Sequence, residues 1–240
     1  MDYGIQLYSV NEHMANDVGG TIEQVAKMGY TFVETAGFFG KTAQEFKAIC
    51  DQAGVRICSA HTSHDMLLNG EDKIWLPYHK ALNCPYFISP VGACSNKAEL
   101  EKLISCINEC AAICRQNGME FMYHNHHTEF IPNTDGVIPH LQLQEHTDIR
   151  FQIDVYWVYR AGIDPMYILQ QLGDRVGSIH LKDGTMERDT PLGHGNVDIP
   201  NIVKWGKEHK VLMVVENETV PERQIVEAKA CIDYLKTLEV

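Results

Sequence analysis

The sequence contains no uninterrupted apolar run of about 18 residues, the length that a membrane-spanning helix needs. Its first residues also lack the basic segment, apolar stretch and small-residue cleavage site of a secretory signal. Cysteines are present, but no two have the CxxC spacing, so we expect reduced thiols rather than disulfides. These absences predict a cytoplasmic protein without a membrane partner.

Basic residues are scarce relative to acidic ones. The chain has 20 lysines and arginines against 32 aspartates and glutamates, which gives a formal net charge of -12. A surface of this sign repels a phosphate backbone instead of releasing counterions from it. The composition therefore argues against a nucleic-acid partner.

Short apolar runs alternate with amphipathic segments along the whole chain, a pattern typical of consecutive βα units. The runs are Tyr3–Tyr8, Phe32–Thr35, Arg56–His61, Tyr86–Val91, Glu120–Asn125, Phe151–Val155, Val176–Leu181 and Val211–Glu216. No nucleotide-binding glycine motif follows any run, which disfavours the alternative of an open doubly wound sheet. The length of 240 residues is close to the roughly 250 of a (β/α)8 barrel. We predict an α/β fold, a (β/α)8 TIM barrel, in which residues 1–240 form a single domain.

Ionisable residues gather where these runs end. In a (β/α)8 barrel the carboxyl ends of the strands meet at one mouth, where active sites lie. Glu34 ends the second run and His61 ends the third. We expect both side chains to line this mouth and to contact a bound substrate.

Three further run ends suggest a metal site. Asp154 lies in an otherwise apolar run, where an unpaired carboxylate is costly to bury. A salt bridge to arginine or capping by backbone amides is the alternative to a cation. His180 and Glu216 end the next two runs, and with Asp154 they make a nitrogen and oxygen ligand set suited to Mn, Co, Zn or Mg.

The fifth run supplies a further ligand candidate. His124 and His126 share one face of a strand because side chains alternate, so the residue spacing leaves open which of them is the ligand. Lys182 follows His180 by two residues and should point to the same side. It could stabilise a developing oxyanion or pair structurally with Asp183 or Glu218.

Two other residues are candidates for substrate contact. Trp157 lies three residues after Asp154 and could form an apolar wall for a sugar ring, although a packing role is the alternative. His194 stands between two glycines in a long connection that could approach the substrate or form a plain surface turn.

With these residues in view, the chain resembles the xylose-isomerase-like sugar phosphate isomerase/epimerase superfamily. The resemblance lies in the segments 4–9, 29–34, 59–61, 123–126, 153–157, 180–183 and 193–195. They span nearly the whole chain, and they identify the superfamily better than any activity within it.

The resemblance implies a TIM barrel that binds a divalent metal through the ends of strands five to eight. In ketose epimerases the ligands are Glu, Asp, His and Glu. By position they correspond to His124, Asp154, His180 and Glu216, so the first ligand departs from the epimerase pattern. This choice places His126 higher in the mouth. Relatives with a Tyr-His-Asn-His strand include inosose-dehydratase-like and keto-glycoside-cleaving proteins.

The function expected from this reading is removal of a proton next to the carbonyl of a small carbohydrate or keto-sugar by an isomerase or epimerase. Glu216 is the first candidate base, and Lys182 and His126 are the other catalytic candidates. The main alternative is a lyase, either inosose dehydratase-like or a 3-keto-glycoside-cleaving β-elimination enzyme. A non-catalytic sugar-binding subunit is disfavoured by the intact ligands, and an abasic-site endonuclease by the charge of -12. The sequence leaves the substrate, the metal and a homo-oligomeric state open.

Overall fold

The computed structural model describes residues 2–238, and parallel strands form a closed barrel at its centre. The barrel strands are β1 (Gly4–Gln6), β2 (Phe32–Ala36), β3 (Arg56–His61), β4 (Tyr86–Ser89), β5 (Glu120–His124), β6 (Arg150–Asp154), β7 (Val176–Leu181) and β10 (Leu212–Val215). The order around the barrel is β1-β10-β7-β6-β5-β4-β3-β2, and every neighbouring pair is parallel. The predicted TIM barrel is confirmed, since the open sheet would have left two unpaired edges.

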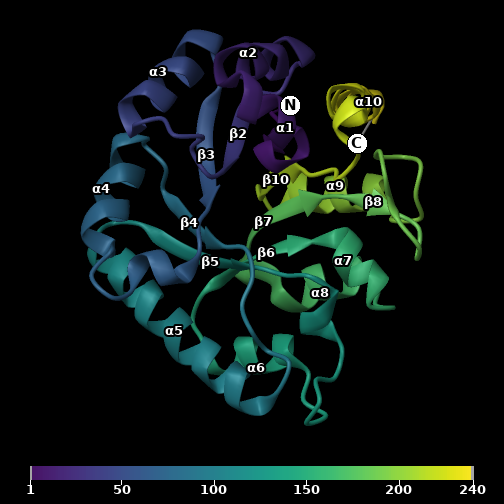
Figure 1. The fold of residues 1–240 in the computed structure, drawn as a ribbon. Coiled ribbons are helices and arrows are strands. Elements are labelled where there is room, and N and C mark those ends of the chain that lie inside the picture. The colour runs from purple at the N-terminus through teal and green to yellow at the C-terminus, as the bar shows by residue number, and fades with distance from the viewer. Residues whose placement is uncertain (1, 239–240) are drawn as a thin grey trace.

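Helices surround the strands in Figure 1, as the alternating sequence pattern predicted. The α-helices are α1 (Asn11–Asn16), α2 (Val18–Met28), α3 (Ala43–Ala53), α4 (Asp72–Ala81), α5 (Lys97–Gln116), α6 (Pro139–His146), α7 (Val155–Arg160), α8 (Pro165–Leu172), α9 (Ile199–Glu208) and α10 (Gln224–Thr237). Short 3-10 helices are η1 (Leu7–Val10), η2 (His64–Leu67), η3 (His127–Phe130), η4 (Gly173–Arg175) and η5 (Pro221–Arg223). In the described range 2–238, no helix is both long and apolar enough to cross a bilayer.

Local sequence signals explain where the helices begin and end. Thr42 caps α3, because its hydroxyl accepts the Glu45 amide while the Glu45 carboxylate accepts the Thr42 amide. The same helix ends at Gly54, whose φ of 77° is the left-handed conformation that glycine adopts without a Cβ clash. Such caps fix the point at which the chain leaves a helix and enters the next strand.

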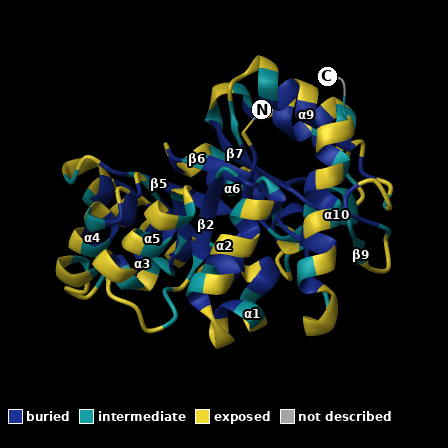
Figure 2. Ribbon diagram, turned by 90° about the horizontal axis from the view of Figure 1, so that it is seen from above, coloured by how far each residue is buried: buried dark blue, intermediate teal, exposed yellow. Residues whose placement is uncertain are grey.

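Figure 2 shows buried residues in the strands and exposed residues on the outer faces of the helices. The apolar core lies mainly between these two layers. The inside of the barrel is different, because it holds buried polar side chains such as Gln6, Glu34, Ser59 and Gln152. A barrel interior of this kind is costly unless its polar groups bind one another or a ligand.

The structure differs from the predicted elements mainly in the connections. The first apolar run leaves the sheet after Gln6, because Leu7–Val10 turns into η1. After β7 the chain forms a small antiparallel hairpin, β8 (Asp183–Gly184) and β9 (Asp189–Thr190). Strands of two residues have no readable alternation, so the sequence did not predict this hairpin.

Candidate metal centre

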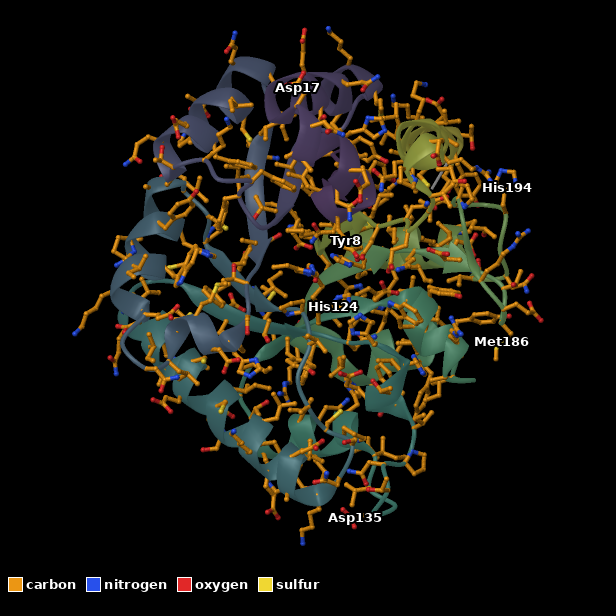
Figure 3. The ribbon with its side chains drawn as sticks, in the orientation of Figure 1. Tyr8, Asp17, His124, Asp135, Met186 and His194 are labelled. Atoms are coloured by element: carbon orange, nitrogen blue, oxygen red, sulfur yellow. The ribbon has the colours of Figure 1, made fainter. Side chains whose placement is uncertain are left out.

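Four ionisable side chains from four adjacent strands meet inside the mouth of the barrel. His124 ends β5, Asp154 ends β6, His180 lies in β7, and Glu216 follows β10. Each offers a ligand atom within 4.8 Å of the others, and all four residues are buried. Figure 3 places His124 at the centre of the barrel. The structure thus brings together the four residues predicted as metal ligands, and His126 is not among them.

The free atoms of this cluster fit a divalent cation. His124 Nδ1, Asp154 Oδ2, His180 Nδ1 and Glu216 Oε2 are buried without a hydrogen-bond partner. His180 Nδ1 lies 2.5 Å from Glu216 Oε2, close enough for an ion pair when the ring is protonated, and 3.9 Å from Asp154 Oδ2, which is too far for a hydrogen bond. Leaving several such atoms unsatisfied in one place costs on the order of 1–3 kcal/mol each. A divalent ion accepting two nitrogens and two carboxylates would satisfy all of them.

The backbone at the end of β6 explains which Asp154 oxygen is free. Asp154 Oδ1 accepts the amide of Trp157 at 3.0 Å and so caps α7. Asn125 holds the same strand end from β5, because its side chain accepts the Asp154 amide at 3.1 Å and donates to the Asp154 carbonyl at 3.3 Å. These contacts leave Oδ2 facing the cluster. Asn125 is a supporting residue that the sequence analysis missed.

A buried carboxylate holds the other side of the His180 ring. Glu34 Oε1 lies 2.6 Å from His180 Nε2, and the same carboxylate accepts from Gln6 at 2.7 Å and Gln152 at 2.8 Å, and also from Ser59. Glu34 is fully buried. The Glu34 carboxylate therefore contacts side chains inside the barrel, whereas the sequence predicted that it would contact the substrate. A carboxylate behind a histidine fixes the ring orientation and directs its other nitrogen toward a metal.

His61 lies between this network and the cluster. Its Nε2 is 2.6 Å from Gln152 Oε1 and 3.1 Å from Glu34 Oε1. Its ring stacks on the ring of His180 with centroids 5.2 Å apart, and lies 5.0 Å from that of His124. His61 is partly exposed, so it connects the buried cluster with the open part of the mouth.

The charges of the network shift the pKa values of its members. Burial alone would raise the pKa of Glu34, but His61 and His180 lower it to about 2. Burial would lower the pKa of His180, but Glu34 and Glu216 raise it to about 10. Burial raises the pKa of Asp154 to about 7, although Lys182 opposes this effect. Opposite charges thus outweigh desolvation at Glu34 and His180 but not at Asp154.

Lys182 lies beside the cluster and is already paired. Its Nζ contacts Glu218, lies 4.0 Å from Glu216 Oε1, and stands 4.9 Å from the Trp157 ring centroid. Burial would lower its pKa, but the carboxylates of Glu216, Asp154 and Glu218 raise it, so the side chain is an ammonium group. Lys182 has an ion-pair partner in Glu218 and also borders the mouth. This position is compatible with both roles predicted from the sequence, a structural ion pair and the stabilisation of an oxyanion.

His126 and Trp157 form a wall next to this lysine. The His126 ring lies 5.5 Å from the Trp157 ring and 5.0 Å from the His124 ring. His126 Nδ1 is buried without a hydrogen-bond partner. The two residues lie beside the cluster, and their contact with a substrate stays a prediction from the sequence.

His194 is not part of this arrangement. It is exposed, and Figure 3 shows it at the edge of the molecule, away from His124. Its flanking glycines surround Asp183, whose carboxylate accepts the amides of Gly193 at 2.9 Å and Gly195 at 3.0 Å. The glycine motif therefore builds a connection around a buried carboxylate. A substrate contact by His194 stays a prediction from the sequence.

The supporting residues left a partial signal in the sequence. Gln152 interrupts an apolar run in the same way as Asp154, so the cost of burial could have identified it. Gln6 interrupts the first run in the same way, whereas Ser59 gives no such signal, because a small hydroxyl group is less costly to bury.

Comparisons with known proteins agree with this geometry. A family model described as xylose isomerase-like TIM barrel matches residues 22–238. Inosose dehydratase of Geobacillus kaustophilus (strain HTA426) is 23% identical over 198 residues, which are 72% of this chain and 64% of that protein. The match thus spans less than two thirds of that relative's length.

Solved structures share the fold over the whole chain. A sugar phosphate isomerase/epimerase from Parabacteroides distasonis ATCC 8503 superposes with a TM-score of 0.87 at 24% identity, covering 99% of this chain and 98% of that one. A probable 3-DHS dehydratase from Bacillus anthracis superposes with a TM-score of 0.76 at 14% identity, covering 99% of both chains.

Proposed function

Because the chain belongs to the xylose isomerase-like TIM barrel family, we propose that it is a divalent-metal-dependent enzyme of the sugar isomerase/epimerase type. In this proposal it removes a proton next to the carbonyl of a small carbohydrate or keto-sugar. The observation that carries the proposal is the meeting of four buried ligand atoms, from His124, Asp154, His180 and Glu216, within 4.8 Å of one another. Mn, Co, Zn and Mg all suit two imidazoles and two carboxylates.

The bound cation would polarise the substrate carbonyl and its adjacent hydroxyl. Glu216 is the first candidate for the base, since its carboxylate belongs to the cluster and its Oε1 lies 4.0 Å from Lys182 Nζ. The Lys182 ammonium group is placed to stabilise negative charge that develops on a substrate oxygen. His126 is the second candidate for moving a proton, and Trp157 would support the apolar face of the sugar ring. His61 would meet the substrate where it borders the open mouth.

His124 favours isomerisation or β-elimination over epimerisation between two opposed carboxylates. Two neutral histidines and two carboxylates contribute about two negative charges, whereas three carboxylates and one histidine contribute about three. A metal held by His124, Asp154, His180 and Glu216 would therefore be a stronger Lewis acid than one held by three carboxylates and one histidine, and His124 replaces one of the two carboxylate bases. Elimination is the second candidate function, and the similarity to a protein named inosose dehydratase supports it.

Metal analysis combined with a substrate panel tests the proposal. The purified protein should contain about one divalent ion per chain, as expected for a single cluster of four ligands. It should convert a member of a panel of ketoses, inososes and 3-keto-glycosides, and product analysis separates isomerisation, epimerisation and elimination.

Asp154→Asn should remove most of the metal and the turnover while keeping the fold, because the change is nearly isosteric but removes the charged ligand. The matched control is Asp135→Asn, since Asp135 is exposed and lies at the edge of the molecule (Figure 3). Circular dichroism checks that both variants fold. Wild-type metal content and full activity in Asp154→Asn would contradict the proposed site.

A further inference from the structure

A cavity of about 390 Å³ opens beside His61, outside the metal cluster. Its walls include Phe38 from the connection after β2, Met66 from η2, and Trp75 and Tyr78 from α4. The volume lies within the range of roughly 300–1,000 Å³ that small-molecule sites occupy. Its apolar walls contrast with the imidazoles and carboxylates of the cluster.

The aromatic walls pack into a fixed arrangement. The Phe38 ring lies 4.4 Å from the Tyr78 ring and 6.2 Å from the Trp75 ring, with the latter pair stacked at 21°. Phe38 also meets the buried Phe46 edge-on at 5.9 Å. These contacts hold the rings in place, yet Phe38, Trp75 and Tyr78 all remain partly exposed. Aromatic side chains that are fixed but still accessible can receive another ring.

The backbone that carries Phe38 is strained. Gly37, Phe39 and Gly40 have φ values of 81°, 51° and 72°. A left-handed conformation is rare for a residue as bulky as Phe39 and costs on the order of 1–3 kcal/mol. Strain of this kind is concentrated at sites where ligands bind. The loop keeps a costly conformation, and Phe38 is presented to the cavity in that conformation.

The hydroxyl groups around the cavity already have hydrogen-bond partners, and the exposed Lys41 side chain also lines it. The Tyr78 hydroxyl donates to the Lys41 carbonyl at 2.5 Å, and the Thr62 hydroxyl pairs with His79 Nε2 at 3.2 Å. Ser63 Oγ accepts the amide of Asp65 at 3.3 Å. A second sugar ring would bring hydroxyls that need partners here, and few are free. An apolar ring needs none.

His61 borders both the cavity and the metal cluster. It lines the cavity, and its ring lies 5.0 Å from that of His124 and 5.2 Å from that of His180. A ligand that fills both spaces therefore has a polar part at the cluster and an apolar part against Phe38 and Trp75.

We propose that this cavity is a subsite for an aromatic substituent of the substrate, so that the enzyme acts on aryl-substituted keto-sugars in preference to free monosaccharides. The inference rests on the proposed function for the identity of the polar part. The aromatic part of the ligand is inferred from the cavity alone, so the subsite and the proposed function can be tested separately.

Ligand-observed NMR with benzyl alcohol tests the cavity without any turnover. Benzyl alcohol should bind saturably to the wild-type protein. Trp75→Ala should weaken this binding about tenfold, because it removes a large part of the apolar wall. Tyr167→Ala is the matched control, since Tyr167 is an exposed aromatic residue of α8. Phe38→Leu replaces Trp75→Ala if that variant does not fold. Unchanged binding in the wall variants overturns the subsite.

Added Mn(II) tests whether the cavity adjoins the cluster, because a paramagnetic ion broadens the resonances of nearby ligands. Broadening of bound benzyl alcohol should occur with the wild type and not with Asp154→Asn. If the protein binds Mn(II) but the ligand is not broadened, the proposed continuity is wrong. If the protein binds no metal while benzyl alcohol still binds, the proposed function fails and the apolar site stands.

Paired substrates test the preference itself. The benzyl 3-keto-glucoside and the methyl 3-keto-glucoside release alcohols of similar acidity, so a subsite should give the benzyl compound a kcat/KM about tenfold higher, and Trp75→Ala should abolish the difference. Equal values for the two substrates in the wild type overturn the proposal.

Discussion

The four cluster residues differ in whether they carry a proton before metal binds. His180 has a pKa of about 10 and is protonated at neutral pH, while Asp154 has a pKa of about 7 and is partly protonated. Burial lowers the pKa of His124 well below its usual value, and it is neutral. Burial would raise the pKa of Glu216, but Lys182 and His180 lower it well below its usual value. His124 and Glu216 can thus bind a cation directly, whereas His180 and Asp154 must first lose a proton.

Metal binding should therefore release protons, and the number should fall as pH rises. At pH 8 we expect about one proton per metal, from His180, and at pH 6 about two, because Asp154 is then also protonated. Since protons compete with the cation, the affinity should increase with pH. Calorimetry in two buffers of different ionisation enthalpy measures both quantities. Binding without proton release at either pH would contradict this assignment.

Lys182 is the residue whose role can be separated from metal binding. Lys182→Met keeps an unbranched side chain against Trp157 but removes the ammonium group. Turnover should fall roughly a hundredfold, as for the loss of one oxyanion donor, while metal content stays near that of the wild type. Steady-state kinetics and metal analysis measure the two effects.

The control for this variant is Lys204→Met, because Lys204 is an exposed lysine on α9. It should leave both quantities unchanged. If turnover of Lys182→Met at saturating substrate is unchanged, Lys182 has no role in catalysis and serves only in its ion pair with Glu218.

Among the elements, the connection after β7 is organised by one buried carboxylate. Asp183 accepts four backbone amides, those of Gly184, Gly193, Gly195 and Val197, at 2.8–3.0 Å. A Cβ at Gly195 would lie 2.2 Å from Asp183 Oδ1, so only glycine allows this approach. The sequence showed the glycines but gave no reason to pair them with Asp183. The reason for these glycines is visible only in the folded structure, where residues 193–197 lie against the Asp183 carboxylate.

Asp183→Asn should loosen this connection. An asparagine offers one acceptor oxygen and turns an NH2 group toward amides that also donate, so about half of these bonds are lost. We expect faster hydrogen exchange at residues 193–197 and a loss of about 1–3 kcal/mol in the free energy of unfolding. Mass-spectrometric exchange and urea unfolding measure these changes. Asp174→Asn, an exposed site in η4, is the control, and equal exchange in both variants would contradict the role of Asp183.

For the whole molecule, the repeating pattern was sufficient to predict the barrel, but not its polar interior. Each of the eight apolar runs contains or overlaps a barrel strand, because the period of about thirty residues leaves little freedom in the topology. Asp154, His180 and Glu216 could be predicted to meet because they end neighbouring strands. The bonds from Glu34 to Gln6 and Gln152 could not, since they cross 28 and 118 residues of sequence and depend on the exact register inside the barrel.

The stability of the whole fold should depend on pH through two histidines outside the metal cluster. Burial lowers the pKa of His79 to about 4 and that of His140 to about 3. The His79 ring stacks on Phe87 at 4.8 Å, and the His140 ring lies 4.3 Å from that of Phe130. Both histidines are therefore neutral in the folded protein at pH 5, whereas histidines in the unfolded chain become charged below about 6.5.

Because the folded pKa values lie below the unfolded one, this stability is fully present above pH 6.5 and is lost as pH falls toward 4 and then 3. Each histidine changes the free energy of unfolding by about 0.7 kcal/mol per pH unit at pH 6.5, where the unfolded residue is half protonated, and by about 1.4 below it, so the two together should cost roughly 3 kcal/mol between pH 6.5 and pH 5. Urea unfolding at both pH values measures the difference.

The Asp154→Asn background removes the separate pH dependence of metal binding. In it, replacing His79 and His140 by glutamine should flatten the pH dependence, whereas replacing the exposed His146 should not. If the double variant loses as much stability on acidification as its parent, buried histidine is not the cause.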